Sequence, residues 1–367
     1  MSTIPILRDL TPVGRIAVIV TAIISILGVL MEWVFQIHGT PLFFVSAAGI
    51  LGLAYVVGIA TERLGALAGP QAGGILNATF GNIAELIIAF FALTAGQLEV
   101  VKASITGSII GNLLLVLGAS FLFGGLRNGT QKFSAKVAGL DSTLLVLAVV
   151  GLFVPAVFAF SQGATQGNGH RIEESVVVSV VLLGLYFLNL FYRFRHPHEV
   201  LGGTEPPAEH EGPAWPVRTA LGVLGVAAVF LAILSESLVS SIDPFIESFD
   251  LTPFFVGVIL IPTIGNLAEH VVGVQLALKD RMDFSMAVSI GSSLQVALFV
   301  APVLVLLGVV VGQPMDLVFN PLEVAAVAAA VATCALVSMD GESNWLEGAL
   351  LMGVYAILGV SFFYLVG

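Results

Sequence analysis

Long apolar stretches recur along almost the whole chain. A transmembrane helix needs about 20 consecutive apolar residues. A transmembrane β-barrel would instead show strands of about 10 residues with alternating hydrophobicity. The stretches here are continuous, so the sequence predicts an all-α integral membrane protein with eleven transmembrane helices. The expected spans are 13–36, 41–60, 74–95, 104–125, 139–160, 175–194, 217–239, 251–277, 284–311, 318–337 and 346–366.

The composition excludes an ordinary soluble protein. Of the 367 residues, 57% are hydrophobic and 10% are charged, whereas soluble proteins carry about 25% charged residues. A chain this long and this apolar cannot form one soluble core. Its single cysteine, Cys334, can make no intrachain disulfide.

The basic residues predict the orientation, because lysine and arginine concentrate in cytoplasmic loops. Eleven spans with a cytoplasmic N-terminus divide the 13 basic residues 11 to 2. The larger group is Arg8, Arg15, Arg63, Arg127, Lys132, Lys136, Arg193, Arg195, Arg218, Lys279 and Arg281, and the smaller is Lys102 and Arg171. We therefore expect a multi-pass protein of a prokaryotic cell membrane, with its C-terminus on the opposite side.

A polar, acidic and proline-rich segment at 196–216 divides the chain. We interpret it as a mobile cytoplasmic linker; weak metal binding by its histidines and glutamates is the alternative. The predicted organisation is an N-terminal segment with helix 1 (1–40), a first five-helix repeat (41–195), the linker, and a second five-helix repeat (217–367).

The two predicted repeats share a polar motif, Gly81-Asn82-Ile-Ala-Glu85 and Gly265-Asn266-Leu-Ala-Glu269, at an offset of 265 − 81 = 184 residues. The first copy falls in the third span and the second in the eighth, so the two copies run in opposite directions. Inverted repeats with a site near the membrane midplane are a recurring transporter plan. A carboxylate at membrane depth costs roughly 2.5 kcal/mol or more, so two in matching frames indicate a site for a positive ion.

The donors at the motifs are all oxygen atoms. Glu85, Glu269, Asn82 and Asn266 provide side chains, and we expect carbonyls near Thr79 and Thr263 to be freed where Pro262 and the glycines Gly81 and Gly265 loosen the helices. Oxygen ligands suit hard cations such as Ca2+. Because burial disfavours a bare dianion, proton uptake is the natural replacement when the ion leaves. We therefore assign the metal and the protons to Glu85 and Glu269.

A second set of polar residues follows each motif. Ser108 and Asn112 in the first repeat, and Ser292 and Gln295 in the second, are candidates to hold the glutamates in place. The alternative is ordinary hydrogen bonding between packed helices. His270 is either a proton relay or a satisfied core histidine. Five further acids, expected at the membrane interface, are Glu32, Asp141, Glu236, Glu323 and Glu347.

At these motifs the chain resembles the calcium/proton antiporters, the cation exchanger family within the calcium/cation antiporter superfamily. The resemblance lies in NATFGNIAELI at 77–87, GNLAEH at 265–270, GSSLQVALF at 291–299, FGGLR at 123–127 and SNWLEG at 343–348. It implies eleven helices, an acidic loop after helix six, and exchange of Ca2+ for H+ by alternating access. The family's central glutamates map onto Glu85 and Glu269, and its motif asparagines onto Asn82 and Asn266.

The resemblance also bears on the coupling ion. Sodium-coupled relatives usually have proline before the motif acid, whereas this chain has Ala84 and Ala268. We expect a Ca2+/H+ antiporter in the lipid bilayer with no cofactor, no enzymatic activity and no nucleic-acid partner. A Na+/Ca2+ exchanger is the alternative within the superfamily. A passive channel and an intramembrane protease are the alternatives from other classes, and the protease motifs His-Glu-x-x-His and Gly-x-Gly-Asp are absent.

Overall fold

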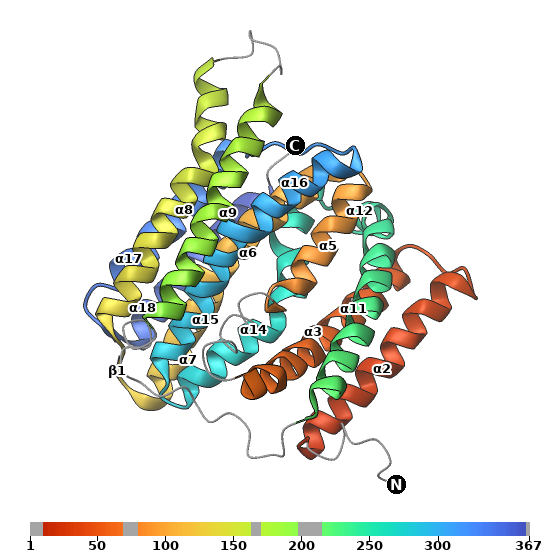
Figure 1. The fold of residues 1–367 in the computed structure, drawn as a ribbon, viewed down its shortest axis with the longest axis horizontal. Helices are drawn as coiled ribbons and strands as arrows, with labels where there is room; N and C mark the ends of the chain where they lie inside the picture. The colour runs from red at the N-terminus through yellow and green to blue at the C-terminus, as the bar shows by residue number, and fades with distance from the viewer. Residues whose placement is uncertain (1–9, 69–79, 163–169, 197–214, 365–367) are drawn as a thin grey trace. The chain divides into compact units, whose positions relative to one another are not determined.

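The computed structural model describes residues 10–68, 80–162, 170–196 and 215–364 (Figure 1). In this part of the chain, nine helices are long and apolar enough to cross a membrane. Two shorter apolar helices, Ile83–Thr94 and Pro321–Val337, accompany them. The prediction of an all-α, multi-pass membrane protein is confirmed. Most of the predicted linker, 197–214, lies outside the described residues.

In chain order the elements are α2 (Pro12–Trp33), α3 (Thr40–Ala68), α5 (Ile83–Thr94), α6 (Leu98–Ile110), η1 (Gly111–Val116), α7 (Leu117–Asn128), β1 (Gln131–Lys132), α8 (Ala135–Gln162), α9 (Arg171–Arg195), α11 (Val217–Ser240), α12 (Ile242–Phe249), α13 (Pro253–Phe255), η2 (Val256–Leu260), α14 (Ile261–Leu278), α15 (Met282–Gln295), η3 (Val296–Val300), α16 (Ala301–Val311), α17 (Pro321–Val337), β2 (Glu342–Ser343) and α18 (Trp345–Phe363). The η elements are π-helical turns that continue directly into α-helices.

The chain forms two compact units. Unit 1 comprises Met1–Phe91, Gly203–Leu251 and Ile264–Ala268, and unit 2 comprises Ala92–Gly202, Thr252–Thr263 and Glu269–Gly367. In unit 1, α3 contacts both α2 and α11 (Figure 1). A stacked ring pair, Phe43 on α3 and Phe245 on α12, with centroids 4.0 Å apart, fixes the end of this cluster.

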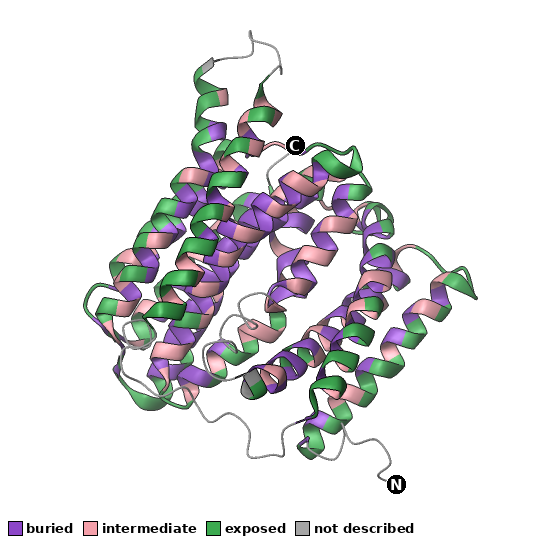
Figure 2. Ribbon diagram, in the orientation of Figure 1, coloured by how far each residue is buried: buried purple, intermediate pink, exposed green. Residues whose placement is uncertain are grey.

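Unit 2 is built around α6. Every α6 residue from Ala103 to Ile110 is buried, and the helix contacts η1, η2 and α17 (Figure 2). Around it, α7 packs on α18, α8 on α17 and α9 on α16. The strands β1 and β2 form a two-residue antiparallel pair that joins the start of α8 to the start of α18.

The outer helices expose apolar side chains rather than polar ones. On α9 the exposed large apolar residues include Val177, Val180, Leu188 and Phe191. Soluble monomers rarely expose continuous apolar patches of more than a few hundred Å². These faces therefore fit contact with lipid tails, as the apolar stretches predicted.

Element boundaries recur at the spacing found in the sequence. Helix α5 ends at Thr94 and α14 at Leu278, which is 278 − 94 = 184 residues later. Helix α6 begins at Leu98 and α15 at Met282, again 282 − 98 = 184 residues later. The π-helical turn η1 begins at Gly111 and η3 at Val296, within one residue of the same offset. The repeated sequence thus carries repeated local structure.

Two acids expected at the interface are instead buried. Asp141 on α8 is 3% exposed and forms an ion pair with Arg193 of α9. Glu323 on α17 is also 3% exposed; it accepts a hydrogen bond from the Thr106 hydroxyl at 2.7 Å and closes a capping box with Asn320. The interface prediction was wrong for both, because position near a span end says nothing about partners on neighbouring helices. Glu236 is exposed, as expected.

Candidate functional site

The first motif lies where a helix begins. Gly81 and Asn82 form a turn directly before α5, and the Asn82 carbonyl accepts the first helical bond from Leu86 N–H at 3.0 Å. Glu85 lies in the first turn of α5. The sequence expectation that Asn82 and Glu85 share one helical face is therefore wrong in detail, because Asn82 caps the helix instead of lying within it. Thr79 lies outside the described residues.

Glu85 is buried, 8% exposed, against the second motif. The Asn266 side-chain amide donates a hydrogen bond to Glu85 Oε1. A Cβ built at Gly265 would lie 2.7 Å from Glu85 Cγ, so the absent side chain at Gly265 makes room for the carboxylate arm. Gly81 is half-buried and Asn82 is buried. The structure thus brings Glu85 together with two residues of the other repeat.

The second motif lies inside a continuous helix. We expected Pro262 to break the helix, but α14 runs through it and is preceded by the π-helical turn η2. The π turn absorbs the missing N–H of Pro262, because it moves the donor from four residues after the acceptor to five; Ile261 N–H, for example, bonds the Val256 carbonyl. The Thr263 hydroxyl donates to the Ile259 carbonyl at 2.6 Å.

Glu269 follows Asn266 by three residues on α14, so the two lie on nearly the same face of that helix. The Ser292 hydroxyl of α15 donates a hydrogen bond to Glu269 Oε2. His270 beside it is half-buried, and its Nε2 has no hydrogen-bond partner among the described residues. The structure therefore shows Ser292 on the second carboxylate and shows no relay contact for His270.

The remaining predicted residues lie on the helices that follow the motifs. Ser108 is buried on α6, and Asn112 is buried in η1. Gln295 is half-buried at the end of α15, directly before η3. Asn112 and Gln295 therefore flank the two matching π-helical turns. Such turns are frequent at functional sites, and the sequence analysis had no signal for them.

The charge of the site comes from few groups. Among the described residues there is no cluster of three or more His, Cys, Asp or Glu that could hold a metal ion. A cation bound at the motifs would therefore be held by at most two carboxylates together with neutral oxygens from amides, hydroxyls and carbonyls. Calcium takes 6–8 oxygen ligands of this mixed kind.

Close backbone contact positions the helix that leads into the second motif. A Cβ at Gly107 of α6 would lie 2.7 Å from the Val258 carbonyl carbon, and a Cβ at Gly257 would lie 2.6 Å from the Ala103 Cβ. Helices approach this closely in membranes where glycine removes the side chain. Sequence reasoning noted Gly107 only as one of the repeated positions and missed its contact with η2.

The sequence of this chain matches one family along both halves. That family is described as "Sodium/calcium exchanger protein", and its profile matches residues 38–195 and 219–364. The chain belongs to this family. The resemblance stated from the paired motifs is therefore confirmed.

Several members of the family are similar over nearly the full chain. A "Ca(2+)/H(+) antiporter" of Synechocystis sp. is 45% identical over 342 residues, which cover 89% of this chain and 91% of that protein. The "Ca(2+)/H(+) antiporter ChaA" of Bacillus subtilis is 40% identical over 345 residues, 93% of this chain and 96% of that protein. These family members share the chain's length as well as its motifs.

Solved structures of the family have the same fold. The structure titled "native YfkE" is 37% identical, with a TM-score of 0.81, and the match covers 96% of this chain and 100% of that one. The "H+/Ca2+ Exchanger CAX" is 14% identical, with a TM-score of 0.72, and covers 96% of this chain and 92% of that one. At 14% identity the second likeness concerns the fold alone.

Proposed function

We propose that this family member is a Ca2+/H+ antiporter, a secondary active transporter that moves cytosolic Ca2+ out as protons move in. One observation carries the proposal: Asn266 binds Glu85 and lies one helical turn before Glu269 on α14. This spacing supports a single site served by both glutamates. The names of relatives that are 40–45% identical support the choice of ions.

The proposed site holds one Ca2+ between Glu85 and Glu269, with Asn82, Asn266 and nearby carbonyls as neutral ligands. Two carboxylates neutralise one divalent ion. Burial favours the protonated form of a carboxylic acid that has lost its cation. The glutamates therefore alternate between a Ca2+-bound and a protonated state, and an empty ionised site is the state that the transporter avoids.

The proposed topology has eleven transmembrane helices: an extra N-terminal helix and two inverted five-helix repeats, 41–195 and 217–367. The 184-residue offset of helix boundaries supports the repeat. The two segments matched by the family profile also support it, since they fall on either side of the linker. Inverted repeats give a transporter two related arrangements that open the site to opposite sides in turn.

The proposed orientation follows from the 11 to 2 division of basic residues, with the N-terminus in the cytoplasm and the C-terminus outside. We place the protein in a prokaryotic cell membrane. Extrusion of Ca2+ is then downhill for protons, which enter along both their chemical gradient and the membrane potential.

The rival function is Na+/Ca2+ exchange, since the family description includes both ions. Purified protein in liposomes separates the two. We expect Ca2+ to accumulate when a proton gradient is imposed, and we expect no accumulation when only a sodium gradient is imposed. Uptake is measured with radioactive Ca2+, and a pH-sensitive dye in the lumen reports proton counterflow. Uptake that follows sodium and ignores pH would overturn the proposal.

A substitution at Gly265 tests the contact with Glu85. We expect Gly265→Ala to leave the helix intact, because alanine favours helix by up to about 1 kcal/mol relative to glycine. The added methyl must displace Glu85, and overpacking typically costs about 1–3 kcal/mol, so we expect a roughly tenfold rise in the Ca2+ concentration for half-maximal transport.

The matched control for this test is Gly291→Ala on α15, where a Cβ would meet nothing within 4 Å. We expect this variant to transport Ca2+ like the unmodified protein. Equal Ca2+ dependence of the two variants would show that Gly265 does not set the position of Glu85.

A further inference from the structure

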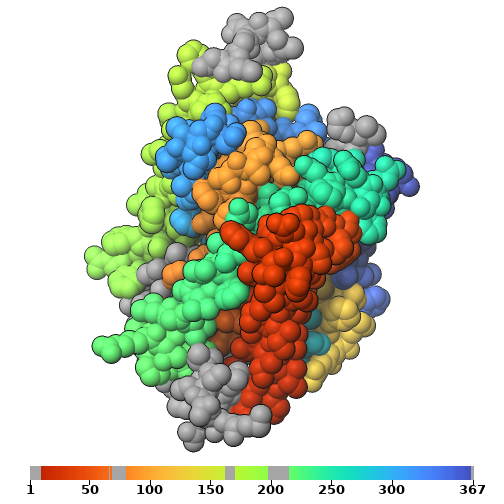
Figure 3. All heavy atoms as spheres, turned by 90° about the vertical axis from the view of Figure 1, so that its right-hand side faces the viewer, coloured from red at the N-terminus to blue at the C-terminus, as the bar shows by residue number. Residues whose placement is uncertain are grey.

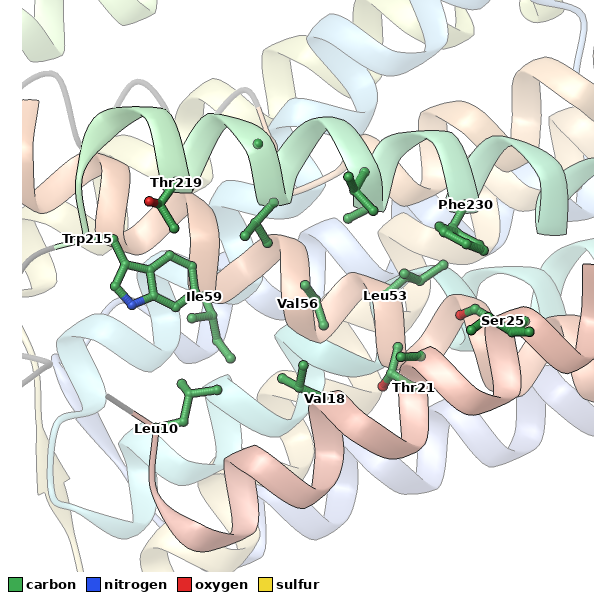
Figure 4. A pocket seen from close by; sticks show the side chains of 16 residues that line it. Leu10, Val18, Thr21, Ser25, Leu53, Val56, Ile59, Trp215, Thr219 and Phe230 are labelled. Atoms are coloured by element: carbon green, nitrogen blue, oxygen red, sulfur yellow. The ribbon is translucent and has the colours of Figure 1, made fainter. Parts of the chain in front are cut away.

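A groove in unit 1 is left open by the packing of α2, α3 and α11. Its volume is about 530 Å³, within the range of about 300–1,000 Å³ typical of small-molecule sites. Figure 4 shows side chains from all three helices converging on it. The labelled lining residues are Leu10, Val18, Thr21, Ser25, Leu53, Val56, Ile59, Trp215, Thr219 and Phe230.

The groove is long and narrow. Its lining on α11 runs from Trp215, just before the helix, to Phe230. At 1.5 Å per residue this stretch is roughly 22 Å long, more than the roughly 15 Å thickness of one membrane leaflet. Gly222, Val226 and Ile26 on its rim are exposed, so the groove opens sideways onto the lipid-facing surface where α2 and α11 lie side by side (Figure 3). These dimensions fit an extended hydrocarbon chain.

Two polar groups inside the groove lack partners. Trp215 is 3% exposed and Ser25 is 2% exposed. Neither the Trp215 indole Nε1 nor the Ser25 hydroxyl has a hydrogen-bond partner among the described residues. An indole N–H can only donate, and a buried donor without an acceptor costs about 1–3 kcal/mol. The groove therefore favours an occupant that brings an acceptor to Trp215.

Positive charge lies at the same end as Trp215. Arg15 donates a hydrogen bond from Nε to the Leu10 carbonyl at 2.9 Å, and Leu10 lines the groove. Arg218 is exposed three residues beyond Trp215. Glu62 on α3, three residues after Ile59, is the nearby acid in sequence, so the two arginines leave this end positive. Guanidinium groups pair strongly with phosphate.

We propose that the groove holds one acyl chain of a membrane phospholipid, with an ester carbonyl at Trp215 Nε1 and the phosphate near Arg15 and Arg218. Lipid tails are as apolar as the groove, so burial alone would not hold one lipid in preference to another. Retention comes from the hydrogen bond to Trp215, the phosphate contacts and the close fit between α2 and α11. This lipid is thus a structural part of unit 1 and distinct from the transported ions.

Tryptophan fluorescence tests the proposal directly, because brominated acyl chains quench tryptophan on contact. Trp33 and Trp345, the other two tryptophans, are replaced by phenylalanine, and the protein is placed in liposomes with increasing fractions of brominated phospholipid. We expect quenching of Trp215 to saturate at a mole fraction about tenfold below that for bulk lipid contact, equivalent to about 1.4 kcal/mol.

The matched variants are Gly222→Leu, which projects into the groove, and Gly225→Leu, one helical turn away and not part of the lining. A Cβ at either glycine meets nothing within 4 Å, so both variants are expected to fold. We expect Gly222→Leu to remove the saturable quenching and Gly225→Leu to retain it. Quenching in simple proportion to brominated lipid, absent quenching because a segment of the chain fills the groove, or equal behaviour of the two variants would each overturn the proposal.

Discussion

Replacing either Glu85 or Glu269 by glutamine is expected to abolish Ca2+/H+ exchange. Glutamine keeps the shape of the side chain but removes both the charge that holds Ca2+ and the group that takes the proton. Removing one partner of a buried charge interaction costs about 3–5 kcal/mol, so we expect Ca2+ transport in liposomes to fall roughly 100-fold or more. The proton flux measured in the same liposomes should fall in parallel, because one site carries both ions.

Binding should fail together with transport. A ligand that binds only the folded state stabilises it by about 2.7 kcal/mol at 100 times its Kd, so Ca2+ should raise the Tm of the unmodified protein and not that of Glu85→Gln or Glu269→Gln. Glu247→Gln is the control, since Glu247 is an exposed acid on α12; it should transport normally and keep the Tm shift. Full transport by either motif variant would refute the mechanism.

The second large effect is expected at Gly348, where α18 packs on α7. A Cβ at this position would lie 2.5 Å from the Gly118 carbonyl oxygen and 2.7 Å from the Leu122 Cα. These neighbours are backbone atoms and cannot swing away as a side chain can. We expect Gly348→Leu to cost more than the roughly 3 kcal/mol of ordinary overpacking and to leave little folded protein, as judged by a monodisperse peak in gel filtration and by Tm.

The control lies on the same helix. Gly353 of α18 is exposed, and a Cβ there would meet nothing within 4 Å. Gly353→Leu adds the same side chain to the same helix on its lipid-facing side, so it should fold normally. If Gly348→Leu gave the same yield and Tm as Gly353→Leu, the close contact of α7 and α18 would not be a requirement of the fold.

Sequence reasoning was accurate where a property depends on a run of residues. Each predicted span overlaps an apolar helix or a continuous series of helical elements, because length and hydrophobicity decide which segments enter a bilayer. It was less accurate at the motifs. Asn82 is a helix cap rather than a helical residue, and Pro262 is accommodated by a π-helical turn rather than a break. Both differences come from local hydrogen bonding that hydrophobic periodicity does not report.

By itself, the sequence determined that the chain is a helical membrane protein with two acids in repeated polar frames. Only the tertiary structure decided which groups meet those acids: Asn266 and Gly265 at Glu85, and Ser292 at Glu269. It also decided that Asp141 and Glu323 are buried with partners and that α2, α3 and α11 leave a groove lined by Trp215. The physical reason is that insertion depends on the sum of many apolar residues along one segment. A contact depends instead on where two distant segments come together, and that is set by the packing of glycines and side chains between helices.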